Sequence, residues 1–76
     1  MNSETFTQRL ARLRKQHAFS YGQLAIAVGI SKSALWSIEA NKEIPSLRTV
    51  VALAHAFGME PGALLAGLDW SEYERS

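Results

Sequence analysis

A cluster of polar and aromatic residues shares one face of a short predicted helix near the middle of the chain. On the opposite face, Ala34, Leu35 and Ile38 follow helical spacing and are expected to point toward a core. The outward residues are Lys32, Ser33, Trp36 and Ser37. The lysine is a hydrogen-bond donor, the hydroxyls both donate and accept, and the indole offers a flat surface. These groups suit recognition of a surface rich in donors and acceptors.

Other chemistries find no support in the sequence. The 76 residues include no cysteine, which excludes a thiolate metal site or a disulfide framework. The two histidines, His17 and His55, belong to different predicted helices and lack HxxxH or HxxE spacing, so a metal site is not expected. No Ser-His-Asp arrangement has local support, and no glycine-rich loop follows a strand. We therefore expect no cofactor and no enzymatic activity.

The segment from Ser20 to Lys42 determines how the outward residues are positioned. With Tyr21 as position 1, apolar residues occupy positions 4, 8, 10, 15 and 18, which are Leu24, Val28, Ile30, Leu35 and Ile38. Ala25 supplies a small side chain where two helices would cross, and Gly29 tolerates a positive φ in the turn between them. This pattern predicts a helix-turn-helix, the motif that carries its second helix into the DNA major groove.

On this interpretation the outward face reads DNA bases. Lys32 can donate to guanine O6 and N7, whereas serine hydroxyls can bond several bases and discriminate weakly. Part of the specificity would then come from DNA shape. The alternative for Ser33 and Ser37 is a solvated helix face. Trp36 could pack on a thymine methyl or a sugar, or lie over the preceding helix.

Local signals predict the other helix boundaries. Thr5 and Ser20 each begin a capping box of the form S/T-x-x-Q, and Ser31 is a good N-cap. Asn41 is suited to end the helix that starts after Ser31, because asparagine tolerates the left-handed conformation. After Pro45, a fourth helix is predicted to end at Gly58, with an apolar stripe of Leu47, Val50, Val51, Ala54 and Phe57.

Pro61 suits the first turn of a short fifth helix containing Leu64 and Leu65. The sequence shows no alternating strand pattern. The predicted fold is therefore all-α, with a compact set of five helices in a single domain over residues 1–76, of which 66–76 form a C-terminal tail.

Charge is distributed unevenly along the chain, although the net charge is only +1. Residues 1–48 carry a balance of +4, and residues 49–76 carry a balance of −3. A polarised molecule can turn a basic face toward phosphate and its acidic end away from it. The apolar runs are too short to span a membrane and no signal peptide is recognised, so we expect a cytoplasmic protein.

The sequence resembles the Cro/C1-type (Xre-family) helix-turn-helix domain of phage repressors and restriction-modification controller proteins. The matching stretches run from Arg9 to about Leu65: RLARLRK before the motif, SIEANK at its end, then IPSLRTVVALAHAFGM and PGALL. The resemblance implies a lambda-repressor-like five-helix fold, dimerisation and sequence-specific operator binding. It also implies an ion pair between Arg14 and Glu39 that locks the second motif helix to the first helix of the domain.

Three residues are expected at the DNA backbone. Tyr21 occupies the position where many family members carry glutamine, at the start of a helix whose N-terminus approaches a phosphate. Lys42 and Arg48 lie in and after the loop that should border the groove, and we assign them to phosphate, or Arg48 to the minor groove.

The C-terminal end is the expected dimer interface. One recognition helix contacts only a few base pairs, so a useful specificity ratio requires two half-sites read together. The candidate interface residues are Leu64, Leu65, Leu68, Trp70 and Tyr73. Aromatic residues are favoured in interface centres, and the three leucines offer more apolar surface than a short helix is expected to bury. The alternative is that Trp70 and Tyr73 fold back on their own domain.

The function most consistent with the sequence is that of a homodimeric transcriptional repressor or autoregulator that binds a near-palindromic operator. A DNA-binding antitoxin is an alternative, although the short tail leaves little chain to bind a toxin. A restriction-modification controller is another. An interaction module that has lost DNA binding is disfavoured by Lys32, Lys42 and Arg48.

Overall fold

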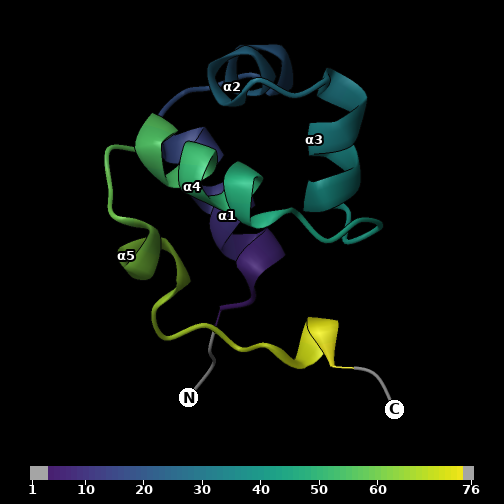
Figure 1. The fold of residues 1–76 in the computed structure, drawn as a ribbon, viewed down its shortest axis with the longest axis vertical. Helices are drawn as coiled ribbons and strands as arrows, with labels where there is room; N and C mark the ends of the chain where they lie inside the picture. The colour runs from purple at the N-terminus through teal and green to yellow at the C-terminus, as the bar shows by residue number, and fades with distance from the viewer. Residues whose placement is uncertain (1–3, 75–76) are drawn as a thin grey trace.

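The computed structural model describes residues 4–74 and contains five α-helices and one short 3₁₀ turn (Figure 1). The helices are α1 (Phe6–Gln16), α2 (Tyr21–Val28), α3 (Lys32–Glu39), α4 (Leu47–Ala56) and α5 (Pro61–Leu65), and the 3₁₀ turn η1 covers Ser71–Tyr73. The predicted all-α, five-helix fold is confirmed. No helix in residues 4–74 is both long enough and apolar enough to cross a lipid bilayer.

The predicted helix starts are present as hydrogen-bonded caps. In the capping box of α1, the Gln8 amide donates to the Thr5 hydroxyl, and the Thr5 amide donates to the Gln8 side chain at 2.9 Å. Ser20 forms the same reciprocal pair at α2, and Ser31 caps α3 by accepting from the Ala34 amide. Each cap satisfies backbone N–H groups that have no partner within the helix. These starts depend on residues at most three positions apart.

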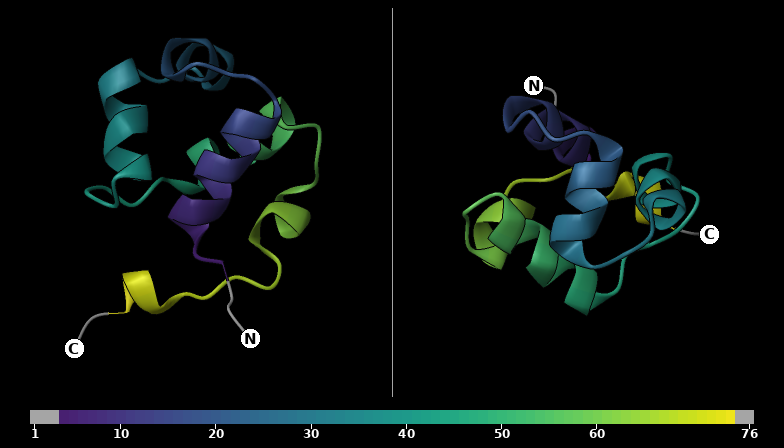
Figure 2. Two further views of the ribbon diagram at one scale, coloured as in Figure 1. Left: turned by 180° about the vertical axis from the view of Figure 1, so that it is seen from behind. Right: turned by 90° about the horizontal axis from the view of Figure 1, so that it is seen from above.

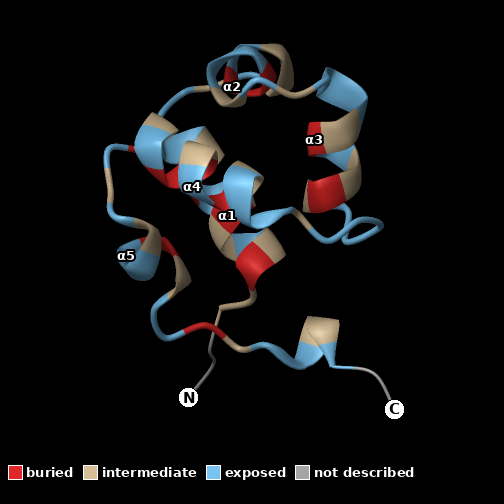
Figure 3. Ribbon diagram, in the orientation of Figure 1, coloured by how far each residue is buried: buried red, intermediate tan, exposed pale blue. Residues whose placement is uncertain are grey.

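The core lies where the inner faces of the helices meet (Figure 3). α2 packs against both α3 and α4, and α1 packs against α3. The buried apolar residues are Phe6, Leu10, Leu13, Leu24, Ala25, Leu35, Ile38, Val50, Leu53, Ala54, Phe57, Leu64 and Leu68. Every helix therefore contributes to one continuous core.

The predicted core stripe of α4 was partly wrong. Val50, Ala54 and Phe57 are buried as expected, but Leu47 is 76% exposed and Val51 is 42% exposed. Leu53, which was not in the predicted stripe, is fully buried instead. The buried residues of α4 repeat at intervals of three and four and occupy one side of the helix. Leu47 and Val51 lie one turn apart beyond the edge of that side, and the other helices of residues 4–74 leave them exposed.

Two of the three C-terminal leucines predicted for the dimer interface have little surface to offer a partner. Leu64 and Leu68 are buried in their own domain, and Leu65 is half-buried against the same core. The Arg9 guanidinium fixes the end of α5, because Nη1 donates to the carbonyls of Leu64 at 3.0 Å and Ala66 at 2.7 Å. The short helix can bury its leucines because the chain around it returns to α1.

The segment after α5 folds back along the start of α1 (Figure 2). The Asp69 amide donates to the Glu4 carbonyl at 2.8 Å. The Glu72 carboxylate accepts from the Thr7 amide at 3.1 Å and from the Thr7 hydroxyl at 2.7 Å, which places a negative charge at the positive end of α1. Of the two aromatic residues that could fold back on their own domain, Tyr73 packs against the core, whereas Trp70 stays 42% exposed. Residues 75 and 76 of the predicted tail lie outside the described part.

Candidate nucleic-acid interface

The turn between α2 and α3 has the geometry that the spacing of residues predicted. Gly29 adopts φ 84° at the end of α2, a left-handed conformation that costs a glycine little. The amides of Gly29 and Ile30 both donate to the Ala25 carbonyl, at 2.8 and 3.0 Å. Ala25 is buried at this point, so the small side chain lets the two helices approach each other. Figure 1 shows that α3 leaves this turn in a direction different from α2.

The outer face of α3 carries the four expected reading residues. Lys32, Ser33 and Trp36 are exposed and Ser37 is half-buried, whereas Leu35 and Ile38 on the inner face are buried. Within residues 4–74, the side chains of Lys32, Ser33 and Ser37 make no hydrogen bond or ion pair. The inner face anchors α3, and the outer face remains available to a ligand.

Trp36 contacts the loop that follows its own helix. The indole is 49% exposed, and the Lys42 Nζ lies 5.9 Å from the centroid of the Trp36 ring system. At this distance an ammonium group is attracted to the electron-rich face of the ring. The contact keeps a loop cation beside the outer face of α3.

Lys42 and Arg48 are both exposed, and neither forms an ion pair within the described part of the chain. Lys42 lies in the loop between α3 and α4, and Arg48 lies in the first turn of α4. The Lys42 amide donates to the Ser37 carbonyl at 2.8 Å, and Asn41 has φ 58°, so the chain turns sharply as it leaves α3. Asn41 thus has the left-handed conformation that was expected of it.

Arg14 and Glu39 form the ion pair that the family resemblance implied. Arg14 Nε donates to Glu39 Oε2 at 2.7 Å, and only 12% and 6% of the two side chains are exposed. Arg14 Nη1 also donates to the Phe19 carbonyl at 3.1 Å. The hydrogen bond to Glu39 raises the pKa of Arg14. One arginine therefore joins α1, the loop before α2 and the end of α3.

The structure differs from the prediction for Tyr21. The Tyr21 hydroxyl donates to Glu39 Oε1 at 3.1 Å, and its ring lies under the Arg14 guanidinium at 4.2 Å from Cζ to the ring centroid. Burial, followed by the adjacent Glu39, raises the pKa of Tyr21, so the hydroxyl keeps its proton. A phenol can donate only one hydrogen bond, and here the acceptor is Glu39. The side chain is therefore part of the anchor for α3 and not a free phosphate donor.

The basic half of the chain has fewer free cations than its composition suggests. The Glu4 carboxylate accepts from Arg9 Nε at 2.9 Å and from Arg12 Nε at 2.6 Å. The hydrogen bond from Arg12, with a smaller contribution from Arg9, lowers the pKa of Glu4 to about 2. With Arg14 also paired, the cations without an ion pair among residues 4–74 are Lys15, Lys32, Lys42 and Arg48. The ion pairs of Glu4 with Arg9 and Arg12 were not predicted from the sequence, because separations of five and eight residues do not match the three- or four-residue spacing of neighbours on a helix.

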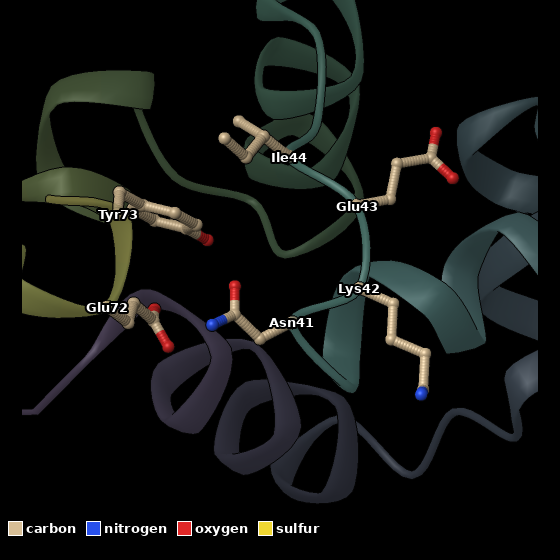
Figure 4. A pocket seen from close by; sticks show the side chains of 6 residues that line it. All are labelled: Asn41, Lys42, Glu43, Ile44, Glu72 and Tyr73. Atoms are coloured by element: carbon tan, nitrogen blue, oxygen red, sulfur yellow. The ribbon is translucent and has the colours of Figure 1, made fainter. Parts of the chain in front are cut away.

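A cavity of about 230 Å³ separates the loop after α3 from η1, and Figure 4 shows the side chains that line it. The Tyr73 hydroxyl points toward Asn41 in this view. Its oxygen is buried without a hydrogen-bond partner in the described residues, and burial is the main reason that its pKa rises to about 12. Tyr73 is thus partly buried against the core, with its ring 6.5 Å from that of Phe6.

Neither histidine belongs to a cluster of potential metal ligands in the described part of the chain. The His17 ring lies 5.2 Å from the Phe57 ring, and His55 is exposed on α4. No group of three or more potential ligands among residues 4–74 is arranged to hold a metal ion.

Several known proteins are similar to this chain, among them two curated proteins and a repressor of known structure. An uncharacterized HTH-type transcriptional regulator, YobD, from Bacillus subtilis (strain 168) is 36% identical over 64 residues, which cover 84% of this chain and 57% of the relative. The immunity repressor protein of Bacillus phage phi105 is 36% identical over 61 residues, covering 80% of this chain and 42% of that protein. The chain thus spans about half the length of these curated relatives.

One of the similar solved structures is that of the P22 c2 repressor protein in complex with a synthetic operator. Its TM-score is 0.76 at 26% sequence identity, and the match covers 86% of this chain and 98% of that chain. The shared fold extends over the helix-turn-helix and the helices around it.

A family model described as a helix-turn-helix domain matches residues 5–68, the region that contains all five helices. The match includes the α2–turn–α3 unit, its glycine turn and the exposed face of α3. The chain therefore belongs to the helix-turn-helix domain family, with the Cro/C1-type (Xre-family) fold that its sequence indicated.

Proposed function

We propose that this chain is the DNA-binding unit of a sequence-specific transcriptional regulator, a repressor or autoregulator that binds a near-palindromic operator as a homodimer. The observation that carries this proposal is the outer face of α3, where hydrogen-bonding side chains are exposed and have no partner within residues 4–74. Similarity to an immunity repressor and to a repressor bound to an operator supports it. A DNA target also agrees with the cytoplasmic location that the sequence favours.

In this proposal the residues of α3 read the bases. Lys32, in the first turn, donates to the guanine O6 and N7 atoms, and the Ser33 and Ser37 hydroxyls contact neighbouring base edges. Trp36 packs on a thymine methyl or a sugar. The side chains are few and mostly weak readers, so DNA shape supplies the remaining discrimination.

Lys42 and Arg48 contact the phosphates on the side of the groove bordered by the loop after α3. Such contacts fix the register of the protein on the duplex but carry no sequence information. The Arg14–Glu39–Tyr21 cluster acts indirectly, because it holds α3 against α1 and α2. The proposed homodimer reads two half-sites about 34 Å apart, the separation of one helical turn of DNA.

Selection of bound sites from a random DNA pool tests the proposal. We expect enrichment of a sequence with two inverted half-sites, and a pool that stays random after repeated rounds would refute sequence-specific binding. On the selected site, Lys32→Ala should weaken binding by roughly 1–3 kcal/mol and relax preference at one base pair. Lys32→Arg, which keeps the donors, is the matched control.

Lys42→Ala should behave differently from Lys32→Ala. It should weaken binding to the selected site and to unrelated DNA by a similar factor, and reduce the salt slope by about one unit. Lys42→Arg retains the charge and should preserve the slope. A Lys42→Ala variant that changes base preference without changing the slope would assign Lys42 to the bases instead.

A further inference from the structure

The cavity of about 230 Å³ beside η1 is bounded on one side by residues beyond the helix-turn-helix family match. That match ends at residue 68, whereas η1 covers Ser71–Tyr73. The opposite side of the cavity is the loop between α3 and α4. The residues that line it are Asn41, Lys42, Glu43, Ile44, Glu72 and Tyr73. The cavity therefore depends on a segment that the family match does not include.

The lining side chains differ in the direction in which they point (Figure 4). The Asn41 side chain points toward η1, and the Tyr73 hydroxyl points toward Asn41. The side chains of Lys42 and Glu43 point away from η1. The Lys42 Nζ lies 5.9 Å from the centroid of the Trp36 ring system, so the only cation among the six lining residues is directed elsewhere.

The groups that remain at the cavity are rich in hydrogen-bond acceptors and carry a negative charge. Each oxygen of the Glu72 carboxylate accepts one hydrogen bond from Thr7, which leaves about half of its acceptor capacity free. The Asn41 amide is exposed and makes no side-chain hydrogen bond within residues 4–74. After burial, the charge of Glu72 is the next cause of the raised pKa of Tyr73. The electrostatic environment therefore favours a cation.

The Tyr73 hydroxyl points to a ligand independently of this charge. Its oxygen is buried and has no hydrogen-bond partner in the described residues. A buried polar group without a partner is costly and uncommon in native proteins. A molecule that enters the cavity and forms a hydrogen bond with this oxygen would remove that cost.

We propose that the cavity is a binding site for a small organic cation, whose ammonium or guanidinium group contacts the Glu72 carboxylate and the oxygens of Asn41 and Tyr73. A charged donor forms stronger hydrogen bonds with a carboxylate than a neutral donor does. The same carboxylate repels anions such as phosphate. A cavity of about 230 Å³ has room for roughly eight non-hydrogen atoms, if each takes the volume of one water molecule in the liquid.

Titration of the isotope-labelled chain with ethylguanidinium chloride, followed by its backbone amide resonances, tests the proposal. Ethylurea has the same shape without the charge and is the matched control ligand, and sodium chloride keeps the ionic strength constant. We expect the resonances of residues 41–44 and 72–73 to shift with a dissociation constant on the order of millimolar, as suits so small a ligand. Ethylurea should bind at least tenfold more weakly.

Two results of this titration would overturn the proposal. The first is the absence of a saturable shift at residues 41–44 and 72–73, which is expected if the cavity holds only water. The second is equal binding of ethylguanidinium and ethylurea, because the site would then not recognise the charge.

Two substitutions with the same change of charge separate a defined site from a general attraction to acidic surface. Glu72→Gln and Glu43→Gln each remove one negative charge from the cavity lining. Glu72→Gln should weaken ethylguanidinium binding at least tenfold. Glu43→Gln should change it less than about twofold, because the Glu43 side chain points away from η1. Equal weakening by the two substitutions would refute the site.

Tyr73→Phe and Asn41→Gly test the other two contacts and leave Glu72, which also caps α1, unchanged. Glycine readily adopts the φ of 58° that Asn41 has, so both variants should fold like the parent. Each should weaken ethylguanidinium binding at least threefold. A folded variant of either kind that binds as tightly as the parent would show that the proposed site is wrong.

The cation site is separable from the proposed DNA-binding function. The titration is made without DNA, and none of Asn41, Glu72 and Tyr73 is assigned to a base or a phosphate. If the chain binds ethylguanidinium as described but selects no DNA sequence, the cation site stands and the proposed function fails. If the chain selects inverted half-sites but ethylguanidinium causes no saturable shift, the function stands and the cation site is refuted.

Discussion

Replacing Glu39 with glutamine should destabilise the domain substantially, although the new side chain has almost the same shape. The Glu39 carboxylate accepts from Arg14 Nε at 2.7 Å, from Arg14 Nη2 at 3.4 Å and from the Tyr21 hydroxyl at 3.1 Å. A glutamine amide has one oxygen and one NH₂ group. Whichever way the amide is oriented, its NH₂ faces a donor from Arg14 or Tyr21, and the guanidinium loses its counter-charge.

The expected cost can be worked out from these contacts. A hydrogen bond to a charged group contributes about 1.5–3 kcal/mol, and breaking one side of a buried ion pair costs about 3–5 kcal/mol. Arg14 is 12% exposed and regains some solvation, so we expect the free energy of unfolding to fall by about 2–4 kcal/mol. For a domain of this size, the melting temperature should drop by roughly 10–25 °C.

Urea unfolding followed by far-ultraviolet circular dichroism measures this change, with Glu60→Gln as the control. Glu60 is exposed and makes no side-chain hydrogen bond at the start of α5, so its substitution should stay within about 0.5 kcal/mol. A double-mutant cycle with Arg14→Met should give a coupling energy of at least about 1 kcal/mol. If Glu39→Gln unfolds like Glu60→Gln, the ion pair does not anchor α3 and the reasoning fails.

Three further predictions concern the N- and C-terminal segments. Tyr73→Phe removes a buried hydroxyl that has no hydrogen-bond partner in the described residues, so it should leave the free energy of unfolding unchanged or raise it by up to about 1 kcal/mol. A fall in that free energy of more than about 1 kcal/mol, measured by urea unfolding, would show that the hydroxyl makes a stabilising hydrogen bond. Glu72→Ala should cost about 1 kcal/mol and increase amide exchange at Thr7, which loses its acceptor; unchanged exchange there would show that Glu72 does not cap α1. The pKa of Glu4 is lowered from 4.5 to about 2 in the folded state, so the stability that the ionised carboxylate contributes is present above about pH 5 and is lost as the pH falls toward 2. The difference in free energy of unfolding between the parent and Glu4→Gln should therefore shrink over this interval. A difference that does not change with pH would contradict this prediction.

Helix starts and the helix-turn-helix were predictable from the sequence because their determinants are local. A capping box joins residues three positions apart, as Thr5 and Gln8 do, and the turn after α2 requires only a glycine that accepts φ 84°. The inner and outer faces of α3 followed from a periodicity of three and four, which places Leu35 and Ile38 on one side. The exposed reading face was therefore defined before any tertiary contact was known, although its base contacts remain predictions.

The tertiary structure decided the features that join distant parts of the chain. Leu64 and Leu68 had the composition of an interface but are buried, because the chain after α5 returns to α1 through Glu72 and Thr7, 65 residues apart. The Tyr21 hydroxyl bonds to Glu39 because folding brings the start of α2 next to the end of α3. A separation of 18 residues in the sequence gives no indication of that contact. An apolar pattern shows which residues of one helix are suited to burial. Which of them are covered depends on where the neighbouring helices end. For this reason Leu47 and Val51 are exposed while Leu53 is buried.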